Sequence, residues 1–168
     1  MDHLVALLRA VNLGPHGKVA MADLRAMAAD LGLDEPKTLL NSGNLVFGSS
    51  KTPAALEKLL EEAAAETLGL DTDFVVRSAA DITKLIKANP FPTEAKTDPG
   101  HLVVLFCKKT LGTSPKVSGA ARERFVVKGR DVYITYPDGI GRSKFKIDAH
   151  GTARNWNTVL KIAAAMAG

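Results

Sequence analysis

The chain has 168 residues and a formal net charge of +4, with 46% hydrophobic and 24% charged residues. This composition is typical of soluble globular proteins and excludes a disordered or fibrous chain. The length suffices for one sizeable core, or for two small cores that share an interface. Aromatic residues make up only 5% of the chain, so aliphatic side chains must fill most of the core.

Several broad classes are disfavoured by single features of the sequence. Asp2 stands where a secretory signal needs a basic flank, and Arg9 interrupts the first apolar run. No apolar segment approaches the length of a membrane span. The single Cys107 rules out an internal disulfide and a cysteine-based metal cluster. We therefore expect a cytoplasmic protein that has no contact with a membrane, no metal site and no cofactor.

The charges are divided unevenly along the chain. Residues 1–99 carry 10 Lys+Arg against 14 Asp+Glu, a net charge of −4, whereas residues 100–168 carry 12 against 4, a net charge of +8. A basic second part is able to meet nucleic acid, an acidic ligand, or the acidic first part of the same chain. Charge alone leaves these three alternatives open.

The first elements in chain order are a strand and a helix. Residues 3–9 are apolar at the consecutive positions 4–8, which is typical of a strand that is covered on both faces. A glycine-rich loop leads to a helix that begins at about Val19. Its inner stripe ends before Gly32, which acts as the stop; the stripe consists of Met21, Leu24, Met27, Ala28 and Leu31.

The next elements complete a βαββαβ order. Residues 37–47 predict a hairpin that turns at 41–44, where Asn, Ser and Gly tolerate positive φ. A second helix begins at Pro53 and ends at Gly69, and residues 71–77 form the fourth strand. This order is that of the ferredoxin-like unit.

The middle of the chain predicts a division into parts. A short helix over 80–88 is followed by a stretch with three prolines and a glycine at 89–100. We expect a ferredoxin-like half at 1–78, a helix and Pro-rich connection at 79–100, and a second α+β half at 101–168, all packed as one compact unit.

The second half is expected to be a degraded copy of the first. Residues 101–106 form a doubly buried strand, and the poorly patterned residues 108–123 have room for one helical turn. A hairpin turning near 128–129 and a polar, basic connection at 137–155 follow. The closing helix over 155–167 has an inner stripe made of Trp156, Val159, Leu160, Ala163 and Ala164. The predicted fold class is α+β, with two ferredoxin-like halves and a C-terminal helix.

Polar residues converge at one predicted edge of the first sheet. In a βαββαβ unit the first two strands are parallel, and the third lies antiparallel between them. The end of the first strand, the hairpin turn and the start of the fourth strand, with Asp71 and Asp73, therefore lie at the same edge. The candidate ligand-binding residues there are Arg9, Asn12, His16, Lys18, Asn41, Ser42 and Asn44.

The loop "NLGPHGKV" after the first strand favours a small anionic ligand at this edge. Backbone amides at the start of the following helix are suited to hold an anion. The loop is not a Walker A motif, because Gly14 and Gly17 are separated by only two residues and Val19 replaces the hydroxyl residue. A tight corner without any ligand explains the same glycines.

An enzyme is the first alternative. His16 is the natural general base, with Asp71 or Asp73 to orient it, and Ser42 becomes a nucleophile only if His16 reaches it. No GxSxG, HExxH or CxxC pattern occurs in the chain. The catalytic residues and the reaction therefore stay unknown.

Nucleic-acid binding through the second half is the other alternative. Basic residues interleaved with Phe145 and Trp156 are of the kind that single-stranded nucleic acid uses. Trp156 also lies on the apolar stripe of the last helix, where it would be a core anchor instead. The candidate basic surface consists of Arg142, Lys144, Lys146 and Arg154.

Three segments, "LLRAVNLGPHGKVAMADL", "NSGNLVF" and "ARNWNTVLK", resemble the bacterial family called domain of unknown function 1697. The resemblance covers essentially the full length. It implies a cytoplasmic bacterial protein with a two-part α+β fold, and it implies no reaction and no catalytic residues. Ala10 and Pro15 depart from the glycines that the family tends to have, and the stretch between Phe145 and Thr152 is short.

Overall fold

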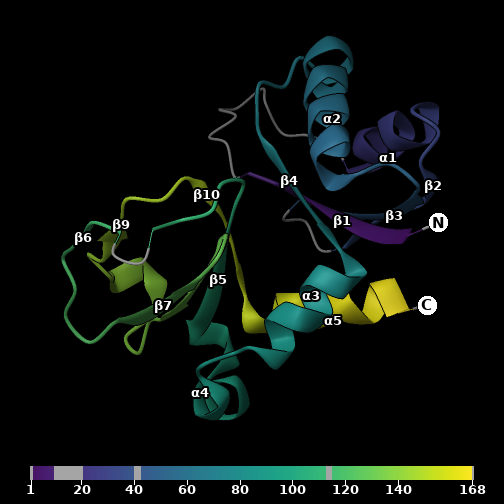
Figure 1. Cartoon of the computed structure of the whole chain (residues 1–168). Helices are drawn as coiled ribbons and strands as arrows, with labels where there is room; N and C mark the ends of the chain where they lie inside the picture. The colour runs from purple at the N-terminus through teal and green to yellow at the C-terminus, as the bar shows by residue number, and fades with distance from the viewer. Residues whose placement is uncertain (1, 10–20, 40–42, 113–114, 168) are drawn as a thin grey trace. The chain divides into compact units, whose positions relative to one another are not determined.

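The computed structural model describes residues 2–9, 21–39, 43–112 and 115–167. The chain splits into two compact units (Figure 1). Unit 1 consists of Met1–Lys84 and the chain from Lys161 onward, and unit 2 consists of Leu85–Leu160. The molecule is a mixed α and β protein with antiparallel sheets and a C-terminal helix.

Unit 1 is built on a four-stranded antiparallel sheet with the order β2-β3-β1-β4. Its strands are β1 (Asp2–Leu8), β2 (Asp34–Leu39), β3 (Asn44–Ser49) and β4 (Phe74–Ser78). The order places β3 between β1 and β2, as the crossover argument requires. Leu4, Val5, Ala6 and Leu7 are all buried, so the prediction of a first strand covered on both faces is confirmed.

Helices α1 (Met21–Asp30) and α2 (Pro53–Leu68) lie on one face of this sheet (Figure 1). The signals that delimit α2 act as predicted, because Pro53 lies in the first turn and Gly69 ends the helix with φ +62°. Thr52 adds an N-cap, since its Oγ1 accepts a hydrogen bond from the Ala55 N–H at 3.2 Å. The alternate residues of the strands meet the inner stripes of the helices in one core. This core includes Leu4, Ala6, Leu24, Met27, Leu45, Phe47, Leu56, Leu60, Phe74 and Val76.

The strand β4 lies at an edge of the sheet, and α2 hydrogen-bonds to it. Glu61 Oε2 accepts the Phe74 N–H at 2.8 Å, and Glu57 Oε2 accepts the Val76 N–H at 2.9 Å. The two glutamates are four residues apart and so share one face of the helix. These carboxylates satisfy edge N–H groups that would otherwise be open to pairing with another chain.

The opposite edge strand, β2, begins at Asp34 and not at 37 as predicted. Its register shifts between Asp34 and Lys37, and Glu35 has φ +42°, so the strand starts with a bulge. Pro36 reads as a strand breaker in the sequence, but at a sheet edge its missing N–H costs no ladder hydrogen bond.

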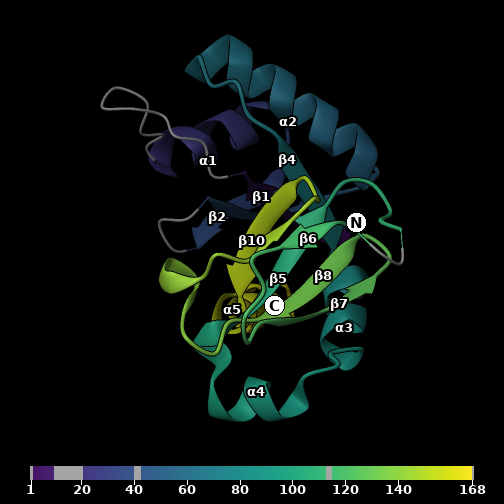
Figure 2. The same cartoon turned by 90° about the vertical axis from the view of Figure 1, so that its left-hand side faces the viewer.

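Unit 2 contains a second four-stranded antiparallel sheet with the order β10-β5-β8-β7 (Figure 2). Its strands are β5 (Leu102–Cys107), β7 (Arg124–Lys128), β8 (Asp131–Thr135) and β10 (Gly151–Asn155). The predicted hairpin is confirmed, with Gly129 at φ +65° in its turn. When the four strands of each sheet are numbered in chain order, both sheets have the same arrangement from one edge to the other: fourth, first, third, second.

The strand β10 corrects the prediction of a polar connection that runs to residue 155. Thr152 and Arg154 are buried, whereas Ala153 and Asn155 are exposed, so the segment alternates as a strand does. Because the buried residues of β10 are polar, the sequence shows no alternation of apolar and polar residues from which the strand could be predicted. Pairing with β5 fixes the strand, which is a case of tertiary context outweighing propensity.

Two further corrections concern short elements between the strands. The Pro-rich stretch 89–100 contains helix α4 (Pro92–Thr97) and the 3₁₀-helix η2 (Pro99–His101), after helix α3 (Ala79–Lys87). Both new elements are too short to show a helical period in the sequence.

The second correction concerns residues 108–123. Their described part holds no helical turn; instead β6 (Val117–Ser118) pairs with β9 (Lys146–Ile147), which follows the 3₁₀-helix η3 (Ile140–Arg142). Two-residue strands have no sequence signature of their own.

The C-terminal helix α5 (Trp156–Ala167) is confirmed, but its inner stripe is not the predicted one. Trp156, Val159, Ile162 and Met166 are buried, and Leu160 is 44% exposed. The helix is apolar around much of its circumference, so the sequence pattern did not single out one face. Neither α5 nor any other helix in the described part of the chain is long and apolar enough to span a membrane.

Helices α3 and α5 begin in the same way, because each directly follows the last strand of a four-stranded sheet, β4 for α3 and β10 for α5. Ser78 Oγ accepts the Asp81 N–H at 3.1 Å, and Asp81 Oδ2 accepts the Ser78 N–H at 3.0 Å, which makes a reciprocal cap. Asn155 Oδ1 accepts the Thr158 N–H at 3.0 Å at the start of α5. Each helix therefore carries its own N-cap residue at the end of the preceding strand.

Two glycines of unit 1 have the same backbone conformation but different surroundings. Gly32 has φ +81° and Gly43 has φ +75°. A Cβ atom on Gly43 would lie 2.7 Å from Leu8 Cβ, whereas a Cβ atom on Gly32 would have no heavy atom within 4 Å. Gly43 therefore permits the end of β1 to approach the hairpin closely.

We predict that Gly43→Ala destabilises the protein more than Gly32→Ala. Both variants place alanine in the left-handed region, at a cost of about 1–2 kcal/mol, and only Gly43→Ala adds a clash with Leu8. Urea unfolding of the two variants measures the difference. Equal loss of stability would contradict the close approach of Gly43 to β1.

Candidate functional site

The candidate edge of unit 1 forms where β1 ends. The Leu8 N–H donates to Gly43 O at 2.8 Å, and the Arg9 N–H donates to Asp73 O at 3.0 Å. Thr72 Oγ1 donates to Arg9 O at 3.2 Å. The end of β1 thus lies between the hairpin and the residues that precede β4. We call Leu8, Arg9, Gly43, Thr72 and Asp73 the rim.

One ion pair lies on the rim. Arg9 NH1 is 3.5 Å from Asp73 Oδ2, and the two side chains are 38% and 41% exposed. At this exposure and distance a single ion pair stabilises a fold by no more than about 1 kcal/mol. The pair therefore presents a guanidinium to solvent without holding it strongly in place.

Asn44 is brought to the rim but does not face solvent. Its side chain is fully buried, and its Nδ2 donates to Leu39 O at 3.1 Å. Leu39 and Asn44 are also the last cross-strand pair of the β2–β3 hairpin. The amide of Asn44 thus closes the hairpin, which is a structural contact.

Five of the seven predicted ligand-binding residues lie outside the described residues. Of the acidic partners considered for His16, Asp71 is exposed and Asp73 contacts Arg9. The residues that lie outside the described ranges are Asn12, His16, Lys18, Asn41 and Ser42.

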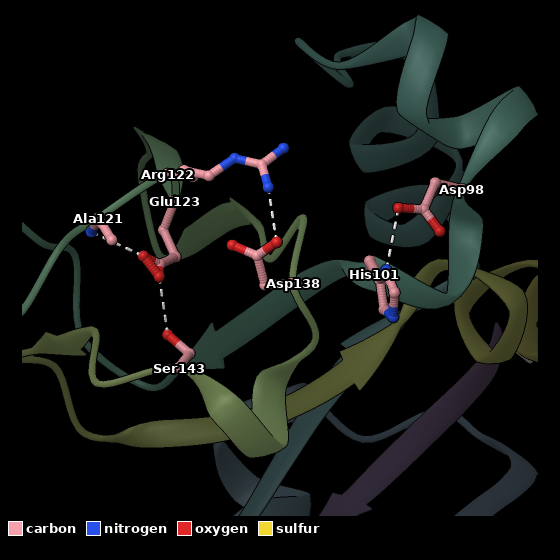
Figure 3. Close-up of polar contacts among 7 residues, drawn as sticks. All are labelled: Asp98, His101, Ala121, Arg122, Glu123, Asp138 and Ser143. Carbon is pink, nitrogen blue, oxygen red and sulfur yellow. Dashed lines mark hydrogen bonds and ion pairs between the residues drawn. The ribbon is translucent and has the colours of Figure 1, made fainter.

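A second polar cluster lies in unit 2, around Glu123 (Figure 3). Glu123 Oε1 accepts the Ala121 N–H at 2.8 Å, and Oε2 accepts the Ser143 hydroxyl at 3.0 Å. Ser143 Oγ in turn accepts the Phe145 N–H at 3.0 Å. The carboxylate thereby ties the residue before β7 to the segment after η3.

These hydrogen bonds change the acidity of Glu123. The Ala121 N–H is the main cause that lowers the pKa of Glu123 below 4.5; burial opposes it, and the Glu123 N–H and the Ser143 hydroxyl add to the lowering. Burial, and after it the charge of Glu123, raises the pKa of Tyr136 above 10.0. Hydrogen-bond donors that stabilise a carboxylate favour its charged form. Glu123 is therefore a charged clamp rather than a proton donor.

Figure 3 also draws an ion pair and a histidine–aspartate contact of unit 2. Arg122 NH1 is 2.6 Å from Asp138 Oδ1, and His101 Nδ1 is 3.0 Å from Asp98 Oδ2. Asp98 stands three residues before His101, so the spacing of this pair is visible in the sequence. The described part of the chain contains no group of three or more His, Cys, Asp and Glu side chains that would hold a metal ion.

The candidate basic surface is divided by the structure. Arg142, Lys144 and Lys146 are exposed, but Arg154 is 7% exposed. Arg154 NH1 donates to Thr152 Oγ1 at 2.6 Å and to Ala153 O at 2.9 Å. Burial lowers the pKa of Arg154 to about 10. Arg154 is therefore an internal hydrogen-bond donor.

The aromatic rings expected to interleave with these cations are also internal. Trp156 is 3% exposed and Phe145 is 8% exposed. Phe145 packs in a core of unit 2, with its ring centroid 5.6 Å from Phe125 and 6.3 Å from Tyr136. The interpretation of Trp156 as a core anchor is supported. Neither ring is exposed enough for a nucleic-acid base to stack on it.

An indentation of about 230 Å³ lies between α1 and α2, apart from the candidate residues. It is mostly apolar, with two aspartates of α1 at its border. Its lining consists of Asp23, Ala26, Met27, Asp30, Leu31, Ala63, Thr67 and Leu68.

Comparisons with known proteins give a family and a structural relative. The family model described as protein of unknown function (DUF1697) matches residues 1–133. The conserved bacterial protein SP0830 from Streptococcus pneumoniae has a similar structure, with a TM-score of 0.73 and 22% sequence identity over 100% of this chain and 99% of that chain. No curated protein matches the sequence. At this identity the structural likeness shows the fold alone.

We predict that Ser143→Ala raises the pKa of Glu123, because the variant removes one donor to its carboxylate. In the wild type the lowered pKa stabilises the fold above the unfolded-state pKa, and this contribution is lost as the pH falls through the folded-state pKa. Titration of the Glu123 carboxyl carbon by NMR checks the shift, with Ser118→Ala as the control. An unchanged Glu123 titration would argue against the clamp.

We also predict that Arg154→Ala and Arg142→Ala differ in stability. Removing the buried guanidinium leaves Thr152 and Ala153 without their donor, which costs about 1–3 kcal/mol. Loss of the exposed Arg142 changes stability by no more than about 0.5 kcal/mol. Urea unfolding of both variants tests this, and a neutral Arg154→Ala would show that the internal contacts do not stabilise the fold.

Proposed function

The chain belongs to the family of proteins of unknown function DUF1697, and we propose that it binds a small anionic ligand at the rim of unit 1. The observation that carries this proposal is the pair of backbone hydrogen bonds from Leu8 to Gly43 and from Arg9 to Asp73. These bonds bring three loops of the chain to one edge, with a partly exposed guanidinium between them.

The chemistry of the rim supports an anion. Arginine offers a planar fork of donors that suits phosphate and carboxylate groups. The segment between β1 and α1 contains Lys18, and it leads into a helix start, where backbone amides favour negative charge. In the sequence, Lys18 follows Arg9 by nine residues, and α1 begins three residues later.

Asp73 sets a condition on the ligand. Its Oδ2 lies 3.5 Å from Arg9 NH1, which is longer than a good charge-assisted hydrogen bond. A ligand with several acceptor oxygens in one plane replaces this contact with a bidentate one. We therefore propose a phosphate-bearing or carboxylate-bearing small molecule, without a catalysed reaction.

We also infer that both units are of the ferredoxin-like type, the second one degraded. The strand order within each sheet supports this, together with α1 and α2 on one face of the first sheet. A bacterial, cytoplasmic protein is part of the same proposal, supported by the sequence resemblance to a bacterial family and by a lone, buried Cys107.

We predict that inorganic phosphate and ATP raise the melting temperature of the wild type but not of Arg9→Ala. A ligand at 100 times its Kd stabilises the folded state by about 2.7 kcal/mol, and Arg9→Ala removes the donor fork. Differential scanning fluorimetry followed by calorimetric titration measures the effect. Arg9→Lys keeps the charge and is expected to retain weak binding.

Lys58→Ala is the matched control, because Lys58 is an exposed cation on α2 of the same unit. It should respond to phosphate and ATP as the wild type does. The proposal is wrong if neither anion stabilises the wild type, or if Arg9→Ala responds as strongly as the wild type.

A further inference from the structure

The small sheet of unit 2 gathers basic side chains from two distant segments. The strands β6 and β9 pair with Val117 opposite Ile147 and Ser118 opposite Lys146. The Asp148 N–H donates to Lys116 O at 2.8 Å, which extends the pairing by one position. Lys116 and Lys146 are thus neighbours on one sheet, although 29 residues of chain lie between them.

Strand alternation decides which face these side chains occupy. From 144 to 148, lysine and aspartate are exposed, whereas Phe145 is buried and Ile147 is partly buried. Directly opposed residues of an antiparallel pair point to the same side. One face therefore points to solvent, and we call it the lysine face; its residues are Lys116, Ser118, Lys144, Lys146 and Asp148.

The two segments of this sheet are held closely together. A Cβ atom on Gly119 would lie 2.0 Å from Lys144 O, which leaves space for glycine only, and Gly119 has φ +69°. The clamp of Glu123 on Ser143 lies next to the same segment. The lysine face is thereby mounted on backbone that is fixed from both sides.

Four of the six acidic groups of unit 2 contact residues outside the lysine face. Unit 2 has 13 Lys+Arg against 6 Asp+Glu, a net charge of +7. Glu94, Asp98 and Asp138 contact an arginine or a histidine, and Glu123 accepts from Ser143. Within the described residues, none of the three lysines of the lysine face is in an ion pair. Asp148 is the one acidic residue of the lysine face.

We propose that the lysine face, together with Arg142 beside it, binds the phosphate backbone of double-stranded nucleic acid without reading its sequence. A row of cations supplies affinity for phosphates and carries no base information. Because Phe145 and Trp156 are buried, the bases of a single strand gain no stacking here. The denser charge of a duplex then makes it the better ligand.

The same features argue against a membrane surface as the partner. Interfacial binding needs apolar side chains that insert beside the cations. None of the five residues of the lysine face has a large apolar side chain. Val117 belongs to the opposite face of the strand pair by its register with Ile147.

The test measures binding of the full chain to a fluorescein-labelled DNA duplex of mixed sequence by anisotropy. With three to four phosphate contacts, the Kd should rise by a factor of about 40 to 150 between 50 and 200 mM salt. A duplex of unrelated sequence should bind equally well, and either strand alone should bind more weakly.

Four variants make the test specific. The double variant Lys144→Gln and Lys146→Gln should make the dependence of log K on log salt less steep, with a slope smaller in magnitude by about 1.8. Asp148→Asn should tighten binding. Lys96→Gln is the matched control, since Lys96 is an exposed cation of α4 in the same unit. Arg9→Ala, in unit 1, should bind the duplex as the wild type does.

Several results would overturn the proposal. They are the absence of duplex binding at low salt, equal loss of affinity in Lys96→Gln and in the double lysine variant, and a salt slope that the double variant leaves unchanged. Binding to phosphatidylserine vesicles without binding to DNA would assign the face to a membrane instead.

Discussion

The hydrogen bonding of β1 on both sides is the constraint on which the candidate site depends. β1 pairs with β3 along one side and with β4 along the other, and the bonding continues past the strand end through Leu8 and Arg9. The chain must therefore leave β1 between the hairpin and β4, whatever the sequence of the loop that follows. The sheet thus fixes the position of the rim.

Two arginines and three lysines of unit 2 differ in their surroundings. The arginines Arg122 and Arg124 pair with Asp138 and Glu94, which suits the planar fork of the guanidinium. Lys116, Lys144 and Lys146, on and beside β6 and β9, are exposed instead, and an ammonium group holds its water strongly. Part of the positive charge that the composition indicates therefore lies on one small sheet.

The sequence predicted the first unit better than the second for a physical reason. Apolar periodicity and end signals such as Pro53 and Gly69 were sufficient for its strands and helices, because the core contacts there are made by apolar residues at regular spacing. In β10 the buried positions are Thr152 and Arg154, so the same rule found no strand. The contact between Glu123 and Ser143 joins residues far apart in the chain, and no local pattern announces it.

The last strands of the two sheets, β4 and β10, share a buried arginine at the same place, although the sequences of the two halves are not similar. Arg77 NH1 donates to Val76 O at 3.5 Å, and Arg154 NH1 donates to Ala153 O at 2.9 Å. Each buried arginine thus donates to the carbonyl of the residue before it and precedes an N-cap residue. A cation near a helix N-terminus is unfavourable, and a contact with a carbonyl oxygen offsets part of that cost. The likeness between the two strands therefore resides in polar positions.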